Sequence, residues 1–201
     1  MSAAAAITAA VGRERKVAAR PPVYHSSNEH PGVREVPVPE GGLAAGFQGV
    51  DYADAYAVAL SLSASARTLA EAVFASAPGW VAALMALRNA LVRPLGLVAT
   101  PSALRHAALR TNGTGERVGI FPILATTPDE VLLGLDDRHL DFRISIRTLD
   151  HGHERQGVVS TLVRFRGALG RAYFLPVRPA HRLIVPAMLR AAARRLSETE
   201  R

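Results

Sequence analysis

The stretch GLDDRHLDFRISIRT, residues 134–148, decides the fold because its second half alternates strictly between polar and apolar side chains. From residue 139 onward the odd positions are polar, whereas positions 140, 142, 144 and 146 are apolar. Such alternation places the two sets on opposite faces of a β-strand. Asp136 and Asp137, just upstream, have the composition of a hairpin turn, whose carboxylates accept hydrogen bonds from turn amides. The stretch therefore predicts the end of one strand, a turn and the next strand.

A period of two continues on both sides of this stretch. It predicts consecutive strands at Val118–Thr126, Glu130–Leu135, His139–Thr148, Gln156–Arg166 and Leu169–Val177. The links between these segments are short turns, which join antiparallel strands but not parallel ones. We therefore expect an antiparallel meander.

Helical patterns flank the meander. Upstream, a first strand at Tyr52–Ser61 precedes two short helices, at Thr68–Ala75 with Thr68 and Glu71 as a capping box, and at Trp80–Val92. Downstream, a last helix is expected at Pro179–Leu196, in which Pro186 either causes a kink or marks the true first turn. This order predicts an α+β helix-grip fold, with a curved antiparallel sheet that wraps a long C-terminal helix and leaves a cavity between them.

Composition indicates one domain with tails. Residues 1–45 are rich in alanine, proline and glycine and predict a disordered leader, 46–197 the single helix-grip domain, and 198–201 a tail. There is no cysteine, which excludes disulfides and thiolate chemistry. No apolar run approaches the roughly 20 residues that span a bilayer, and the N-terminus lacks the features of a secretory signal. We therefore expect a cytoplasmic protein without a membrane span.

The formal net charge of +7 invites a nucleic-acid interpretation. However, the excess positive charge lies in residues 1–20 and 178–201, and the rest of the chain is balanced. A nucleic-acid interface requires a continuous basic face on the folded domain. We therefore predict no nucleic-acid partner.

The charged stretch also contains the best candidates for catalysis. His139 and Asp141 lie two residues apart, so a carboxylate could orient the imidazole as a general base. Alternatively, Asp141 pairs with an opposite charge on a neighbouring strand and has a structural role. We favour the structural interpretation and keep His139 and Asp141 as the catalytic alternative.

Two further clusters have competing interpretations. The segment DHGHE at residues 150–154 contains metal-ligand side chains, but it lies on an expected hairpin tip, and we predict neither a metal site nor a cofactor. Five arginines on one region of the sheet could clamp an anion, or they could form a solvated face partly neutralised by Asp141 and Glu130; these are Arg143, Arg147, Arg164, Arg166 and Arg171. We favour the solvated face.

Several motifs together resemble a bacterial family of unknown function, DUF2867: DYADAY at 51–56, GLDDRHLDFR at 134–143, TLVRF at 161–165, LGRAYFL at 169–175 and RPAHRLIV at 178–185. The resemblance covers about residues 50–196 and implies a more distant similarity to START-like and Bet v 1-like helix-grip domains. Some family members resemble two-domain proteins that carry a short-chain-reductase-like module. This sequence has no G-x-G-x-x-G motif after a strand, so that module is not expected here. No catalytic residue follows from the resemblance.

The resulting expectation is a domain that binds a small hydrophobic molecule between sheet and C-terminal helix. Apolar walls with a few polar groups are typical of such sites. The candidate ligand-binding residues are Trp80, Phe121, Phe142, Arg143, Tyr173, His181 and Met188. The alternatives are an enzyme that uses His139 and Asp141 on a carbonyl or ester substrate, and a non-catalytic partner of a short-chain-reductase-like protein.

Overall fold

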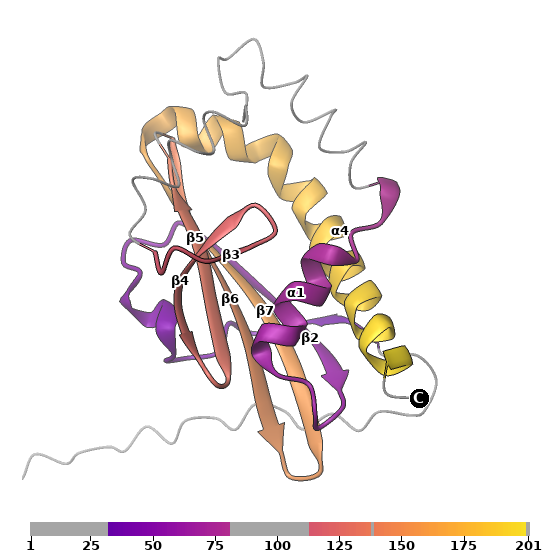
Figure 1. Ribbon diagram of the computed structural model, residues 1–201. Helices are drawn as coiled ribbons and strands as arrows, with labels where there is room; N and C mark the ends of the chain where they lie inside the picture. The colour runs from indigo at the N-terminus through magenta and orange to yellow at the C-terminus, as the bar shows by residue number, and fades with distance from the viewer. Residues whose placement is uncertain (1–31, 81–112, 138, 200–201) are drawn as a thin grey trace, which may run out of the picture.

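The computed structural model describes residues 32–80, 113–137 and 139–199 (Figure 1). Within them, seven antiparallel strands form one sheet in the order β1-β2-β7-β6-β5-β4-β3. The strands are β1 (Arg34–Glu35), β2 (Tyr52–Leu60), β3 (Arg117–Val118), β4 (Phe121–Thr127), β5 (Glu130–Asp136), β6 (Leu140–His151) and β7 (Glu154–Phe165). The helices are η1 (Leu43–Gly46), α1 (Ala66–Ala75) and α4 (Gly167–Thr199). The predicted α+β class, with a curved sheet and a long C-terminal helix, is confirmed.

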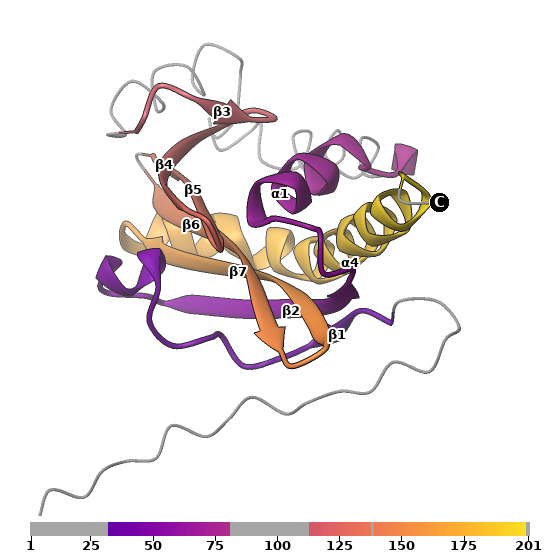
Figure 2. The same cartoon turned by 60° about the horizontal axis from the view of Figure 1, so that its bottom comes forward.

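The two sides of the sheet have different neighbours. Helices α1 and α4 lie on one side, which we call the helix-facing side, and the segment around η1 crosses the other, which we call the outer side (Figure 2). Alternation along each strand decides which side chains meet the helices. The main core lies on the helix-facing side and contains Tyr56, Val58, Leu69, Val73, Ile123, Val131, Leu133, Ile146, Val159 and Leu189.

Three of the five predicted meander strands are confirmed as β5, β6 and β7, whereas the expected strand Val118–Thr126 is divided by a turn at residues 119–120 into β3 and β4. Residues 169–177 were expected to be a strand, but they belong to α4, which begins at Gly167 rather than near Pro179. The buried positions of α4 recur at helical spacing, for example at Gly170, Phe174 and Ile184. Packing against the sheet therefore overrides the β-propensity of the local Tyr173-Phe174 pair.

Prolines inside α4 bend it without ending it. Pro176, Pro179 and Pro186 all lie within the helix, and Figure 1 shows that α4 is not straight. Each proline removes one backbone hydrogen bond and crowds the preceding turn, which is a common cause of helix bending. The expected first turn at Pro186 is therefore wrong, since α4 begins nineteen residues earlier.

Helix α1 also begins earlier than predicted. Its N-cap is Ser65, whose side chain accepts a hydrogen bond from the Thr68 amide, so the capping box assigned to Thr68 is wrong. Glu71 instead pairs with Arg67 at 2.7 Å. The expected second helix, Trp80–Val92, lies outside the described residues apart from Trp80.

Residues 32–46, most of which were assigned to the leader, contain β1 and η1. Leu43 donates its backbone N–H to the buried Glu130 carboxylate at 2.8 Å, which attaches η1 to the outer side of the sheet. Among the described helices, none has an apolar stretch long enough to cross a bilayer.

Candidate functional site

A buried carboxylate lies between β2 and α4. Asp54 points to the helix-facing side, where its side chain is 3% exposed. It accepts a hydrogen bond from the Tyr52 hydroxyl at 2.6 Å, and its other oxygen lies 3.2 Å from Nε2 of His181 on α4. We call Tyr52, Asp54 and His181 the Asp54 cluster. Burying a carboxylate is unfavourable unless it accepts hydrogen bonds, and Tyr52 and His181 are the donors here.

The hydrogen bonds determine what the Asp54 cluster offers to other groups. An ionised carboxylate only accepts hydrogen bonds, so the donor in this contact is the Nε2–H group of His181. In a neutral imidazole this leaves Nδ1 as an acceptor, and the Tyr52 oxygen also keeps a free lone pair. The cluster can therefore accept a hydrogen bond from a hydroxyl or amine of a bound molecule.

The environment holds Tyr52 in its neutral form. Burial raises the pKa of the Tyr52 hydroxyl well above its usual value of 10.0, and the hydrogen bond to Asp54 raises it further. Arg178 acts in the opposite direction, with its guanidinium 5.5 Å from the centre of the Tyr52 ring. Tyr52 is therefore a hydrogen-bond donor to Asp54 throughout the physiological range.

This arrangement predicts the effect of Tyr52→Phe on stability. At pH 8 we expect the variant to lose about 2 kcal/mol of unfolding free energy, since a hydrogen bond to a charged acceptor is removed. Because folding raises the pKa of Tyr52, the contribution of this residue to stability is complete below pH 10 and declines as the pH rises above 10. Urea unfolding should show that the free energies of unfolding of the variant and the wild type differ less at pH 11 than at pH 8. Parallel pH curves for the two proteins would contradict this assignment.

An aromatic row leads away from the Asp54 cluster across the helix-facing side. The Tyr52 ring lies 4.8 Å from Phe174 of α4, and Phe174 lies 5.3 Å from Phe165 of β7. Phe142 packs against the same apolar group as Tyr52 and Phe174, and its ring is 5.4 Å from that of Phe121. Phe142 and Phe121 are both only partly buried. The row therefore keeps apolar surface that the described residues do not cover completely.

Five of the seven residues proposed for ligand binding lie between the sheet and α4, where the four other than His181 are divided between two apolar clusters. Phe121 and Phe142 on the sheet and Tyr173, His181 and Met188 on α4 all lie in or against the apolar contact between sheet and helix. The other two lie elsewhere. Trp80 is half-exposed beside the C-terminal half of α4, and Arg143 lies on the outer side.

The outer side contains the charged residues of the meander. Asp141 is completely buried, and its two oxygens accept hydrogen bonds from Arg164 at 2.6 Å and from Arg166 at 2.8 Å. Hydrogen bonding to Asp141 raises the pKa of Arg166 further above its usual value. Asp141 thus pairs across strands. His139 lies just before β6, where its backbone carbonyl accepts a hydrogen bond from the Arg166 amide at 2.8 Å.

The remaining arginines of the predicted cluster also have partners. Arg143 binds Asp136 at 2.7 Å, Arg147 lies 3.8 Å from Glu130, and Arg171 lies 3.6 Å from Asp51. The ring of Phe47 lies under Arg143, and Arg164 is also close to it. These guanidiniums are neutralised within the chain, which agrees with a solvated face rather than an anion clamp.

Sequence reasoning missed the role of Asp54 and Tyr52. The signal was present, because the alternation of β2 places an aspartate on the same side as Tyr52, Tyr56 and Val58. A charged residue on an otherwise apolar strand face requires a partner. That partner, His181, is 127 positions away and could not be assigned without the structure.

Comparison with known proteins adds a family but no activity. The family model described as "Protein of unknown function (DUF2867)" matches residues 47–188, a range that includes β2, the meander and most of α4. No curated protein and no solved structure matches the chain.

Proposed function

This chain belongs to the DUF2867 family, and we propose that its domain binds a small, largely apolar molecule between the helix-facing side of the sheet and α4. The hydrophobic effect would provide most of the affinity through burial of ligand and aromatic surface. The Asp54 cluster would orient the polar end of the molecule. Because His181 Nδ1 and the Tyr52 oxygen are available as acceptors, that end carries a hydroxyl or another donor.

The position of the Asp54 cluster at one end of the aromatic row carries this proposal. Tyr52 belongs to both, since its hydroxyl binds Asp54 and its ring packs on Phe174. A fixed polar group beside incompletely buried aromatic side chains is the usual composition of a small-molecule site. A purely structural contact of this kind would instead favour complete burial of Phe142 and Phe121.

The catalytic alternative with His139 and Asp141 has less support. An aspartate that orients a general base accepts a hydrogen bond from its imidazole, and none of the hydrogen bonds described for Asp141 comes from His139. Both oxygens of Asp141 are bound by arginines, Arg164 and Arg166. This arrangement supports a structural role for Asp141 and favours ligand binding as the function.

Native mass spectrometry of the purified protein tests the proposal. We expect a co-purifying small molecule in the wild type, lost on denaturation, and a reduced bound fraction in His181→Ala. His139→Ala is the matched control, because it removes an imidazole at the start of β6, and it should keep the bound mass. Polypeptide masses alone in all three preparations, or equal occupancy in the His181→Ala variant, would contradict the proposal.

A second candidate function is association with a short-chain-reductase-like protein. It is favoured by large apolar side chains exposed on α4, where Leu175 is 73% and Leu183 64% exposed. Exposed apolar patches often mark protein contacts. Sedimentation of this chain with a reductase-like module from a two-domain family member tests it. A complex that Leu175→Glu/Leu183→Glu abolishes would support this candidate, and no complex with the wild type would refute it.

A further inference from the structure

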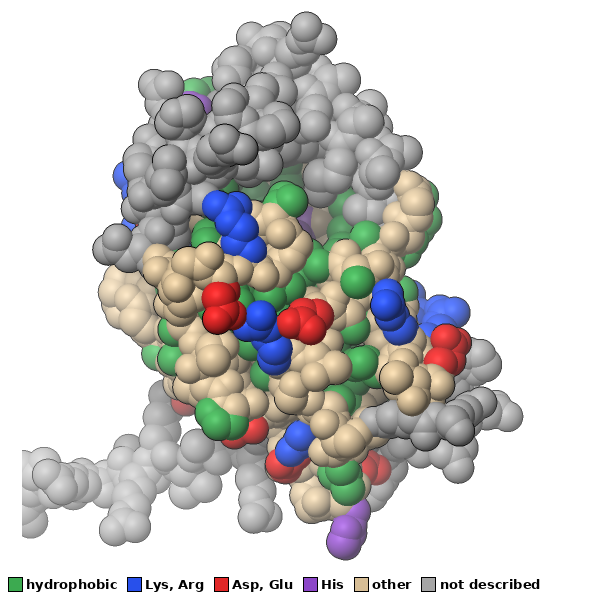
Figure 3. All heavy atoms as spheres, viewed as in Figure 1, with side chains coloured by type: hydrophobic (Ala, Val, Ile, Leu, Met, Phe, Trp, Pro, Cys, Tyr) green, Lys and Arg blue, Asp and Glu red, His purple; other side chains and the backbone are tan. Residues whose placement is uncertain are grey.

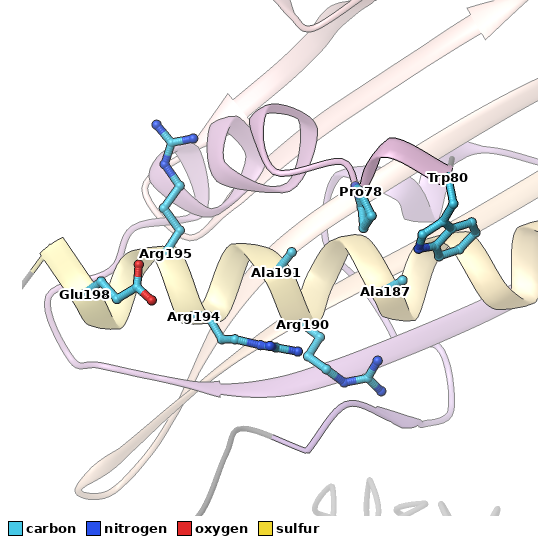
Figure 4. A pocket seen from close by; sticks show the side chains of 8 residues that line it. All are labelled: Pro78, Trp80, Ala187, Arg190, Ala191, Arg194, Arg195 and Glu198. Atoms are coloured by element: carbon cyan, nitrogen blue, oxygen red, sulfur yellow. The ribbon is translucent and has the colours of Figure 1, made fainter. Parts of the chain in front are cut away.

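A second site lies at the other end of α4, beyond the Asp54 cluster. An open groove of about 450 Å³ runs along the C-terminal half of this helix. It is lined by Pro78, Trp80, Ala187, Arg190, Ala191, Arg194, Arg195 and Glu198 (Figure 4). Its volume is within the range of small-molecule sites, which is roughly 300–1,000 Å³.

The groove has an aromatic end and a cationic rim. Figure 4 shows that Arg190 and Arg194 extend to one side of α4 and that Trp80 lies on the other side, next to Ala187. Ala187 and Ala191 form the floor between them, and their small side chains let a bound molecule approach the helix. Ala187 and Arg194 are seven residues apart, which corresponds to about 10 Å along a helix.

The arginines of the groove form no ion pair within the described part of the chain. Some exposed arginines elsewhere lie next to acidic side chains, as Figure 3 shows for part of one face and as Arg67 shows with Glu71 and Glu116. By contrast, no described carboxylate forms an ion pair with Arg190, Arg194 or Arg195, although Glu198 lines the same groove. Arg190 and Arg194, which extend to the same side of α4, give the groove a basic edge that favours an anion, whereas Arg195 extends to the other side.

We propose that this groove binds a small phosphorylated molecule with a flat aromatic ring, of the size of a mononucleotide. The ring stacks on the half-exposed indole of Trp80, and the phosphate lies between the guanidiniums of Arg190 and Arg194. Arginine binds phosphate through paired hydrogen bonds, and it also stacks on flat rings.

Charge and size favour a small phosphate ester over other anions. A phosphate monoester carries a charge of about −1.5 to −2 near pH 7, whereas a carboxylate carries about −1, so a phosphate matches the pair of Arg190 and Arg194 better. The lining residues of α4 span about three turns, or roughly 17 Å, and the groove volume of about 450 Å³ suits an occupant of the size of one nucleotide. This site is independent of the proposed hydrophobic site, since the two have no residue in common.

Titration of the full chain with AMP tests the assignment. Trp80 is the only tryptophan of the chain, so its fluorescence reports on this groove alone. We expect a saturable change in emission with AMP, and at least tenfold weaker binding of adenosine and of ribose 5-phosphate, each of which lacks one of the two groups. The absence of a saturable change with AMP would overturn the proposal.

Matched variants separate the groove from general charge effects. Arg190→Gln/Arg194→Gln should weaken AMP binding at least tenfold. Arg171→Gln/Arg182→Gln removes two charges from α4 outside the groove, where both arginines have acidic partners, and should leave AMP binding within a factor of two. Equal weakening in both double variants, or tighter binding of a single-stranded oligonucleotide than of AMP, would overturn the assignment to a small ligand.

Discussion

Replacing both Arg164 and Arg166 with alanine is expected to lower the free energy of unfolding by about 3 kcal/mol. Asp141 is completely buried, and these two guanidiniums are its hydrogen-bond partners. Their removal leaves the buried carboxylate without a side-chain donor among the described residues. Removing one partner of a buried ion pair costs about 3–5 kcal/mol of stability. We expect a value at the low end of this range because the side chains of Arg164 and Arg166 are 39% and 51% exposed, so water can hydrate Asp141 in the variant.

The triple variant that adds Asp141→Asn distinguishes the charge effect from lost packing. Asparagine has nearly the same shape as aspartate but no charge, so its burial is less unfavourable. Urea unfolding should show that the triple variant regains at least half of the stability lost by the double variant. If the triple variant is as unstable as the double variant, the loss comes from the packing of the arginine stems, and the ion-pair explanation is wrong.

The strands could be predicted because the sheet has different neighbours on its two sides. Asp141, Ser145 and Arg147 alternate with Phe142 and neighbouring apolar residues because one set meets η1 and charged partners while the other meets the helices. The period of two in the sequence therefore reflects the different surroundings of the two sides of the sheet. The cross-strand pairing of Asp141 followed from the same pattern.

The first half of α4 could not be predicted, because local sequence favours the wrong structure there. Tyr173 and Phe174 have high β-propensity, and Pro176 and Pro179 argue against a helix. The helix forms because Phe174 is buried in the aromatic row. This contact joins residues far apart in the chain, as does the hydrogen bond between Asp54 and His181. Long-range contacts of this kind leave no local pattern.

Gly170→Ala is the second substitution with a large expected effect. Gly170 is buried in the first turns of α4, where a Cβ atom would overlap the backbone carbonyl oxygen of His139. A backbone atom cannot move aside as a flexible side chain can. Alanine is the better helix former by about 1 kcal/mol, but relief of the overlap requires displacement of α4 or of the segment before β6. Overpacking costs about 1–3 kcal/mol and occasionally more, so we expect a net loss of about 2 kcal/mol.

The control for this prediction is a site where only helix propensity acts. Ala172 is exposed in the same part of α4, and Ala172→Gly should lower stability by about 1 kcal/mol. Alanine should therefore be the favourable residue at position 172 and the unfavourable one at position 170, two residues apart in one helix. Thermal unfolding of the two variants measures this reversal. A Gly170→Ala variant more stable than wild type would mean that α4 does not pack on the His139 carbonyl, because helix propensity alone would then determine the result.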